Sequence, residues 1–364
     1  MNKLSLLVSL VFGGTSAQAP GAASSQRCQL PAVSAGGPLT TITHDGIGRS
    51  WYTYVPASVA DAQAVVPLVV DLHGYGSDYE FGGCAVIEQK ASGWLTKAEE
   101  FGVIVVWPQA AVEPISVGAQ NTAWNAGACC RFAVDSAGFG PADDVDDVSF
   151  LREMVGQVAA VHPVDANRIY FSGHSNGCMM AQRMLAQASD LVAAVACFAG
   201  YLLAEPSPGY APRPVMTIQG TADPVVPYTA AANIGWPNPG AEENLASWGG
   251  FNGCPGVAST ETALSSYTLH ELDCNGVVSK LVELPGVGHY VFAAPEKNPL
   301  YNATVDGLGA SFDTTQLAWD FVRVASIAVP IPCPADCVPV DARQRRQLLF
   351  GSFLVECPKG CVPA

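Results

Sequence analysis

The chain has 364 residues, of which 49% are hydrophobic and 13% charged, so it is long and apolar enough to bury a large core. Its formal net charge of −15 argues against nucleic acid and acidic membrane surfaces as partners, because both are polyanions. We therefore expect an ordered protein that acts on neutral or apolar molecules.

The N-terminus has the layout of a secretory leader. Lys3 precedes an apolar run at residues 4–12, and small residues follow from Gly13 to Ala23. The run is too short to span a bilayer, and no later segment is long and apolar enough to do so. We predict a signal peptide over residues 1–17 and a secreted, extracellular protein without a membrane span. The alternative is a buried N-terminal strand or a short anchor helix.

Twelve cysteines agree with export, because an even number in an oxidising compartment predicts several disulfides. Reduced zinc sites are the competing interpretation. Spacings such as Cys333/Cys337 are wider than zinc-ribbon pairs, and no histidine lies nearby. Asn302 begins the sequon Asn-Ala-Thr, so an exported chain is expected to carry a glycan there.

The first predicted elements are two alternating segments, 39–44 and 49–55, which flank Asp45-Gly46 and predict a hairpin at a sheet edge. One helical stripe begins behind Asp146 and Asp147, which are both N-cap candidates, and another begins at Asp313. Runs that predict strands buried on both faces are 65–72, 103–107, 169–172, 191–198, 215–218 and 278–284. Strands alternating with helices predict an α/β fold, a mostly parallel sheet with helices on both faces and its functional groups at the carboxyl ends of the strands.

A G-x-S-x-G motif at residues 173–177 lies between the predicted strand 169–172 and a helix-forming segment at 178–185. This context is typical of a nucleophile elbow, a strained turn whose flanking glycines avoid collisions with the neighbouring strand and helix. The motif predicts Ser175 as a nucleophile. The alternative is an ordinary glycine-rich turn.

A serine nucleophile needs an acid and a base, which follow it in that chain order in proteins with such an elbow. Asp223 directly follows the strand 215–218 and is the predicted acid; its alternative role is a turn residue before proline. His289 lies in a glycine-rich loop after the strand 278–284 and is the predicted base, with a solvated loop histidine as its alternative. His270 is instead expected within a strand.

Acyl transfer also needs N–H groups that bind the developing oxyanion. The backbone N–H of Asn176 supplies one by position, and we assign the second to Tyr75, in the loop after the strand 65–72. His73 is expected to orient that loop. Such chemistry needs no cofactor and no metal; we interpret the acidic run Asp143-Asp144 and Asp146-Asp147 as helix capping rather than a calcium site.

These residues resemble the secreted carbohydrate esterase family 1-like α/β-hydrolases, which include feruloyl esterases, acetyl xylan esterases and polyhydroxybutyrate (PHB) depolymerases. The resemblance covers about Leu39 to Ala325 and implies the triad Ser175, Asp223 and His289. The segments that carry it are Tyr54-Val55-Pro56, Leu72-His73-Gly74, Trp124-Asn125-Ala126-Gly127 with Cys129-Cys130, Val145-Asp146-Asp147-Val148, Gly173 to Met180 and Gly220 to Tyr228.

The resemblance also implies that Cys254 pairs with Cys274, whereas Cys178 has Cys129 and Cys130 as open alternatives that would brace the elbow. Many relatives carry Thr-Trp-Pro after the histidine; here Tyr290-Val291-Phe292 stands instead, which predicts an aromatic wall of altered shape. Candidate pocket residues are Trp124, Tyr228, Trp236 and Tyr290, with ordinary packing as their alternative role.

Beyond residue 326 the chain turns to proline and cysteine, and the segment 333–339 recurs as 357–363. We predict a catalytic domain at residues 30–326 and a Cys/Pro-rich tail at 327–364, too poor in apolar residues for its own core. The expected function is a serine esterase acting on feruloyl or acetyl esters of cell-wall polysaccharide. The alternatives are depolymerisation of a polyhydroxyalkanoate polyester and, from another class, a non-catalytic secreted binding protein.

Overall fold

The structure, a computed structural model, describes residues 30–60, 64–76, 84–115, 119–129, 145–231, 236–289, 313–327, 337–339 and 361–363. The predicted signal peptide, Tyr290 and Asn302 lie outside the described residues, as does most of the predicted tail. Among the described helices, none has the length and apolar character needed to cross a membrane.

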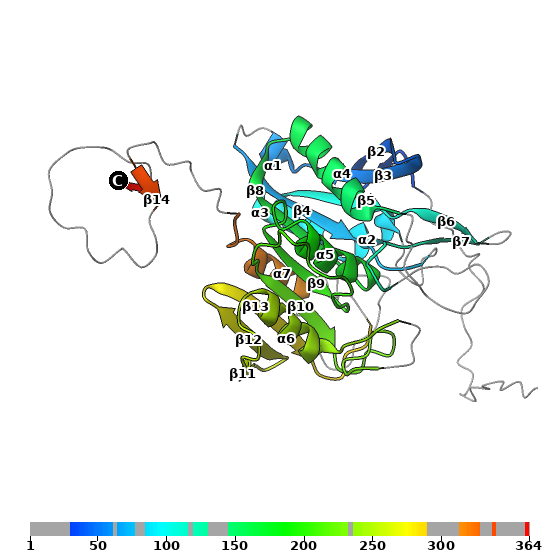
Figure 1. Ribbon diagram of the computed structural model, residues 1–364. Helices are drawn as coiled ribbons and strands as arrows, with labels where there is room; N and C mark the ends of the chain where they lie inside the picture. The colour runs from blue at the N-terminus through cyan, green and yellow to red at the C-terminus, as the bar shows by residue number, and fades with distance from the viewer. Residues whose placement is uncertain are drawn as a thin grey trace, which may run out of the picture.

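One large sheet organises the described chain (Figure 1). Its central strands are parallel, and antiparallel strands flank them at both edges. The strands are, in spatial order, β1 (Val33–Ser34), β2 (Gly37–His44), β3 (Ile47–Tyr54), β5 (Ile104–Gln109), β4 (Val66–Leu72), β8 (Val164–Gly173), β9 (Ala194–Phe198), β10 (Val215–Gly220), β13 (Val277–Leu284), β12 (Thr268–Cys274) and β11 (Thr260–Ala263).

The hairpin of β2 and β3 confirms the first predicted element. Asp45 and Gly46 form its tip with φ angles of 48° and 78°. A two-residue turn with positive φ at both positions matches the twist of the strands, and aspartate and glycine tolerate that conformation best.

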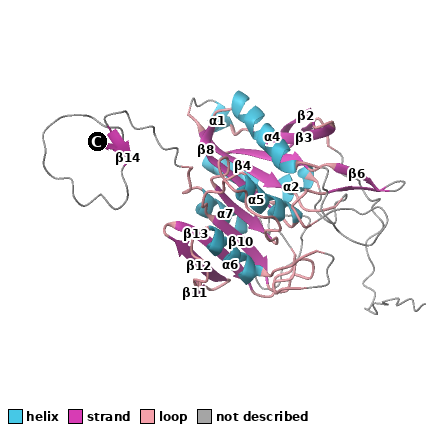
Figure 2. Cartoon of the chain, viewed as in Figure 1, coloured by secondary structure: helices cyan, strands magenta, loops and turns pink. Residues whose placement is uncertain are grey.

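Helices cover both faces of the sheet, as Figure 2 shows in cyan. In β4, Leu68 and Val70 belong to one core cluster, whereas Val69, which points the other way, belongs to a second. The first cluster includes α4 (Asp147–Val161), α5 (Asn176–Gln187) and α6 (Ala241–Phe251). The second includes α2 (Ala85–Ala91), α3 (Trp94–Phe101) and α7 (Thr314–Val322); the short α1 spans Ala57–Ala60. The predicted fold, a mostly parallel sheet between helices as in α/β-hydrolases, is confirmed.

Both predicted helix caps are present. The Asp146 carboxylate accepts the Ser149 N–H at 2.9 Å, and the Asp313 carboxylate accepts the Gln316 N–H at 2.9 Å. Asp147 has a different role, since its buried carboxylate binds the Arg49 guanidinium and accepts a backbone N–H from Asn125 at 2.7 Å. These described acidic residues therefore serve the fold.

Two strand pairs were absent from the sequence prediction. β6 (Val112–Ile115) pairs with β7 (Ala119–Thr122). Both strands are short and show little apolar alternation, and β6 contains a proline. β14 (Cys337–Pro339) pairs with β15 (Cys361–Pro363), so that Val338 lies opposite Val362. The last three residues of one copy of the tail repeat thus pair with the last three residues of the other copy.

Candidate active site

Ser175 lies on a strained turn between β8 and α5, with φ 55° and ψ −121°. A β-carbon at Gly177 would lie 2.0 Å from the Leu72 carbonyl oxygen, and one at Gly173 would lie 2.6 Å from the same atom. Only glycine therefore fits on either side of the serine. Because strain of this kind persists only where the surroundings impose it, the packing of β4 against the turn holds Ser175 in place.

Hydrogen bonds fix the turn further. The Ser175 N–H donates to the Phe198 carbonyl at 2.8 Å, which ties the turn to β9. The fully buried Asn176 side chain accepts the Trp124 N–H at 2.7 Å and donates to the Trp124 carbonyl at 3.0 Å. The Asn176 backbone N–H, the first predicted oxyanion donor, stands at the N-terminus of α5.

The predicted acid and base are in direct contact. The His289 Nδ1 atom lies 2.7 Å from the Asp223 carboxylate, and the Asp223 side chain is fully buried. The other carboxylate oxygen accepts the N–H groups of Val225 and Val226, both at 2.8 Å. Asp223 therefore contacts the imidazole and also holds the turn that follows it, which is the turn role considered from the sequence.

The contact between Asp223 and His289 lies beside the elbow. The His289 ring centroid is 4.7 Å from that of His174, the residue directly before Ser175. His174 is buried, and burial, together with the charge of His289, holds its pKa well below the usual range. His174 is therefore neutral, and it brings no charge to the site. His270, in contrast, lies in β12 and binds Glu283 at 2.8 Å, away from this pair.

The predicted oxyanion loop lies against the nucleophile. A β-carbon at Gly74 would lie 3.5 Å from the Ser175 β-carbon, so the backbone that leads into Tyr75 is close to the serine. Gly76 continues the loop by exchanging backbone hydrogen bonds with Thr122 at 3.1 and 3.2 Å.

The candidate pocket residues take different positions. Trp124 is fully buried and donates from Nε1 to the His73 carbonyl at 2.9 Å, so it helps to fix the predicted oxyanion loop. Tyr228 and Trp236 are half-buried and pack against the same core cluster. Burial, with the charges of Glu283 and Glu242, raises the pKa of the Tyr228 hydroxyl.

Sequence reasoning missed a groove near the carboxyl end of β9. Its volume is about 540 Å³. The apolar residues that line it come from the segment after β7, the loop after β9, the segment before α6 and α6 itself: Ala128, Leu202, Leu203, Ala204, Pro237, Pro239 and Phe251. No sequence pattern joins these segments, because the groove arises only where they meet in the fold.

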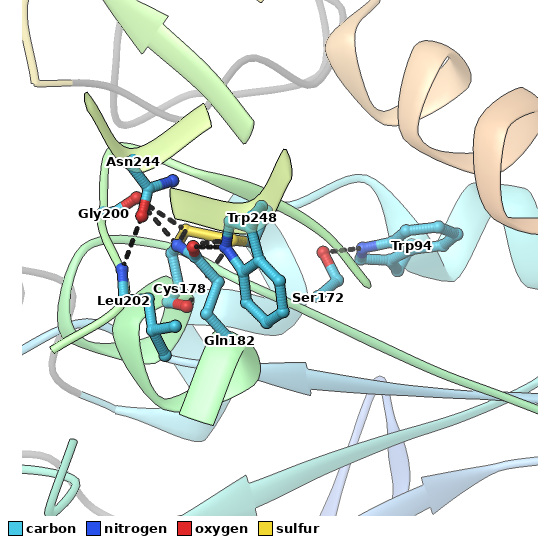
Figure 3. The surroundings of a disulfide bond; sticks show 9 residues. Trp94, Ser172, Cys178, Gln182, Gly200, Leu202, Asn244 and Trp248 are labelled. Carbon is cyan, nitrogen blue, oxygen red and sulfur yellow. Dashed lines mark hydrogen bonds between the residues drawn. A yellow bond between two sulfur atoms is a disulfide. The ribbon is translucent and has the colours of Figure 1, made fainter. Parts of the chain in front are cut away.

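The elbow also carries a disulfide, but its partner differs from both expectations. Cys178 pairs with Cys197 of β9 rather than with Cys129 or Cys130 (Figure 3). In the sequence, Cys197 lies in an apolar run and is typical of a core residue. It comes close to Cys178 only because β9 pairs with β8 in the folded sheet. The second bond joins Cys254 to Cys274, as the resemblance implied.

The side chain of Gln182 connects the elbow disulfide to its surroundings, as Figure 3 shows. It donates to the Gly200 carbonyl at 2.9 Å and accepts the Trp248 indole N–H at 2.8 Å. Nearby, Asn244 accepts the Leu202 N–H at 2.8 Å. α5, α6 and the loop after β9 are thus joined around the Cys178–Cys197 bond.

Comparisons with known proteins show which family the chain belongs to. The family model described as "Esterase PHB depolymerase" matches residues 49–245, more than half of the chain. Feruloyl esterase B of Piromyces equi is 28% identical over 274 residues, which cover 72% of this chain and 42% of that protein. Poly(3-hydroxyalkanoate) depolymerase C of Paucimonas lemoignei is 24% identical over 283 residues, covering 71% and 57%.

The chain therefore matches less than two thirds of the length of either relative. A solved acetyl xylan esterase from Aspergillus awamori has a TM-score of 0.49 and 17% identity, covering 72% of this chain and 97% of that chain. The match of the family model over more than half of the sequence shows that the chain belongs to the esterase PHB depolymerase family.

Proposed function

We propose that the protein is a secreted serine carboxylic-ester hydrolase with the triad Ser175, His289 and Asp223. The contact between His289 and Asp223 carries the proposal, because it lies beside a strained serine turn. An imidazole oriented by a buried carboxylate next to a half-buried serine is the arrangement needed to activate a hydroxyl nucleophile.

In the proposed reaction, His289 donates from Nδ1 to Asp223 and takes the Ser175 hydroxyl proton at Nε2. The serine oxygen attacks the ester carbonyl, and the N–H groups of Asn176 and Tyr75 stabilise the oxyanion. The intermediate then expels the alcohol, which receives the proton from His289. Water, deprotonated by the same imidazole, hydrolyses the acyl-enzyme and restores the serine.

The favoured substrates are feruloyl or acetyl esters of cell-wall polysaccharide. The similarity to a feruloyl esterase supports this substrate class. A polyhydroxyalkanoate polyester is the second candidate, since another relative is a depolymerase and the groove of about 540 Å³ has a largely aliphatic lining. Two disulfides between described cysteines support secretion.

The test compares hydrolysis of methyl ferulate, acetylated xylan and a hydroxybutyrate oligomer by the wild type and Ser175→Ala. We expect the variant to lose at least about 10⁴-fold in kcat on the substrate that is turned over. Its free energy of unfolding should stay within about 0.5 kcal/mol of the wild type, because the change removes one half-buried oxygen. Equal turnover by both proteins would place the nucleophile elsewhere, and no turnover of any ester by folded wild type would favour the binding protein.

A further inference from the structure

We infer that His73 is a positioning residue that sets the direction of the second oxyanion donor, through a hydrogen bond to the carbonyl of the peptide that carries the Tyr75 N–H. The inference rests on the proposed esterase function. It concerns a buried side chain that takes no part in the proton transfers of the triad.

The contacts of His73 define which ring nitrogen carries the proton. Its Nε2 lies 3.0 Å from the backbone N–H of Ala110 and 3.1 Å from the side-chain amide nitrogen of Gln109. The Gln109 amide is oriented by its oxygen, which accepts the Ala85 N–H at 3.0 Å. Because Nε2 faces two donors, it must accept, and the ring proton resides on Nδ1.

The protonated Nδ1 lies 2.7 Å from the Gly74 carbonyl oxygen and donates to it. Burial lowers the pKa of His73 to about 4, and the nearby Arg49 acts in the same direction. The neutral ring therefore keeps this tautomer at neutral pH, where a protonated Nε2 would confront the N–H of Ala110.

Because the peptide unit is planar, this contact also fixes the direction of the Tyr75 N–H. The Gly74 carbonyl and the Tyr75 N–H belong to one rigid unit and point in opposite directions. A hydrogen bond that fixes the carbonyl therefore fixes the N–H. This peptide adjoins the nucleophile, since a β-carbon at Gly74 would lie 3.5 Å from that of Ser175.

The His73 backbone is held as firmly as its ring. Its carbonyl accepts the Trp124 indole N–H at 2.9 Å, and His73 itself is fully buried. The ring is bonded to Gln109 and Ala110 at the end of β5 and so fixes the oxyanion loop relative to that strand. A merely structural histidine would need only the contacts to β5.

Two substitutions separate these contacts. His73→Asn places an amide nitrogen on Cγ, where Nδ1 is bonded, and so keeps a donor for the Gly74 carbonyl while losing the acceptor for Ala110. His73→Gln reaches farther and keeps that acceptor while losing the donor. Each variant is assayed with 4-nitrophenyl acetate, with Ser175→Ala as the blank and thermal unfolding measured in parallel.

We expect His73→Gln to lower kcat about tenfold to hundredfold with little change in KM, because a displaced donor fails mainly in the transition state. His73→Asn should stay within about threefold of the wild-type kcat, even where its melting temperature falls further. The opposite order of kcat, or equal kcat in both variants, would overturn the inference. Wild type that is no faster than Ser175→Ala would instead overturn the esterase proposal itself.

A measurement on the unmodified chain covers the case in which the variants fail to fold. Nitrogen-15 NMR of the histidine rings reports which nitrogen carries the proton. We expect His73 to be neutral with a protonated Nδ1 at pH 7, its ring signals being assigned by through-bond correlation to its own backbone in a uniformly labelled chain. A protonated Nε2 would contradict the inference, because the Gly74 carbonyl would then have no donor from this ring.

Discussion

The proposed nucleophile and its two proposed partners lie in regions that are built differently. Ser175 lies at the centre of the parallel sheet, on a turn that β4, β9 and α5 hold rigidly. Asp223 and His289 lie in loops after β10 and β13, closer to the antiparallel edge. The loop of His289 is held by a few hydrogen bonds, such as that from the Ala222 N–H to the Val287 carbonyl at 3.0 Å. The strained turn thus lies in the buried centre of the sheet, whereas the proposed base lies in a loop whose backbone is more exposed.

Each region has its own disulfide, and the two bonds span nearly equal lengths of chain. Cys178–Cys197 closes 19 residues beside the elbow, whereas Cys254–Cys274 closes 20 residues between the end of α6 and the end of β12. Since the entropic effect of a disulfide depends on loop length, the two should stabilise the fold similarly. Their effects on catalysis should differ.

The two regions also differ in the burial and pairing of their carboxyl groups. Near the elbow, Asp71 and Glu88 are buried, and Asp71 accepts the Trp107 indole N–H at 2.9 Å. At the other edge, Lys280 and Glu271 pair across β12 and β13 at 2.8 Å, partly exposed. Asp71 and Glu88 are thus buried carboxyl groups that influence each other, whereas Glu271 pairs with a cation at a partly exposed position.

The largest effect is expected from a pair of helical glycines. Gly177→Ala should destabilise the protein by about 3 kcal/mol and abolish activity, because its β-carbon would lie 2.0 Å from the Leu72 carbonyl oxygen. Gly250→Ala, on α6 with no atom within 4 Å of the added carbon, should stabilise it by up to about 1 kcal/mol. Urea unfolding and esterase assays measure both. Equal stability of the two variants would mean that the elbow tolerates more volume than its packing indicates.

Removal of each disulfide sharpens the comparison. We expect Cys178→Ala/Cys197→Ala and Cys254→Ala/Cys274→Ala each to lose about 3 kcal/mol of unfolding free energy. Only the first should also lower kcat, by about tenfold, since it frees β9 and α5 beside Ser175. The assays are run at a temperature where both variants are folded. A similar fall in kcat for both would show that the bonds act through general stability alone.

The smallest effect concerns the buried carboxyl groups. Burial raises the pKa of Asp71 to about 7, and burial together with the charge of Asp71 raises that of Glu88. The folded state therefore keeps protons that the unfolded chain releases near pH 4, so stability falls as the pH rises toward and through 7.

Glu88→Gln should remove part of this loss, giving about 1 kcal/mol more stability than wild type at pH 8 and less advantage at pH 5. Thermal unfolding at the two pH values measures the difference. The matched control is Glu243→Gln, a change at an exposed position of α6. A gain independent of pH would mean that the pair does not retain its protons in the folded state.

Local patterns in the sequence were sufficient for the elements that depend on neighbouring residues. The hairpin at Asp45-Gly46 and the caps at Asp146 and Asp313 follow from backbone preferences and hydrogen bonds within a few residues. The elbow also requires only a motif between a strand and a helix. Chain order and placement after strands led to Asp223 and His289, and the structure brings these two into contact.

The sequence by itself therefore determined the central strands of the sheet, the helices that begin behind Asp146 and Asp313, the identity of the candidate triad and the turns that present it. Only the tertiary structure decided the partner of Cys178, the burial of Trp124 and the two-sided contacts of His73. Each of these depends on which strands become neighbours in the sheet. Strand order arises from the packing of apolar surfaces distant in the chain, and no local preference encodes it.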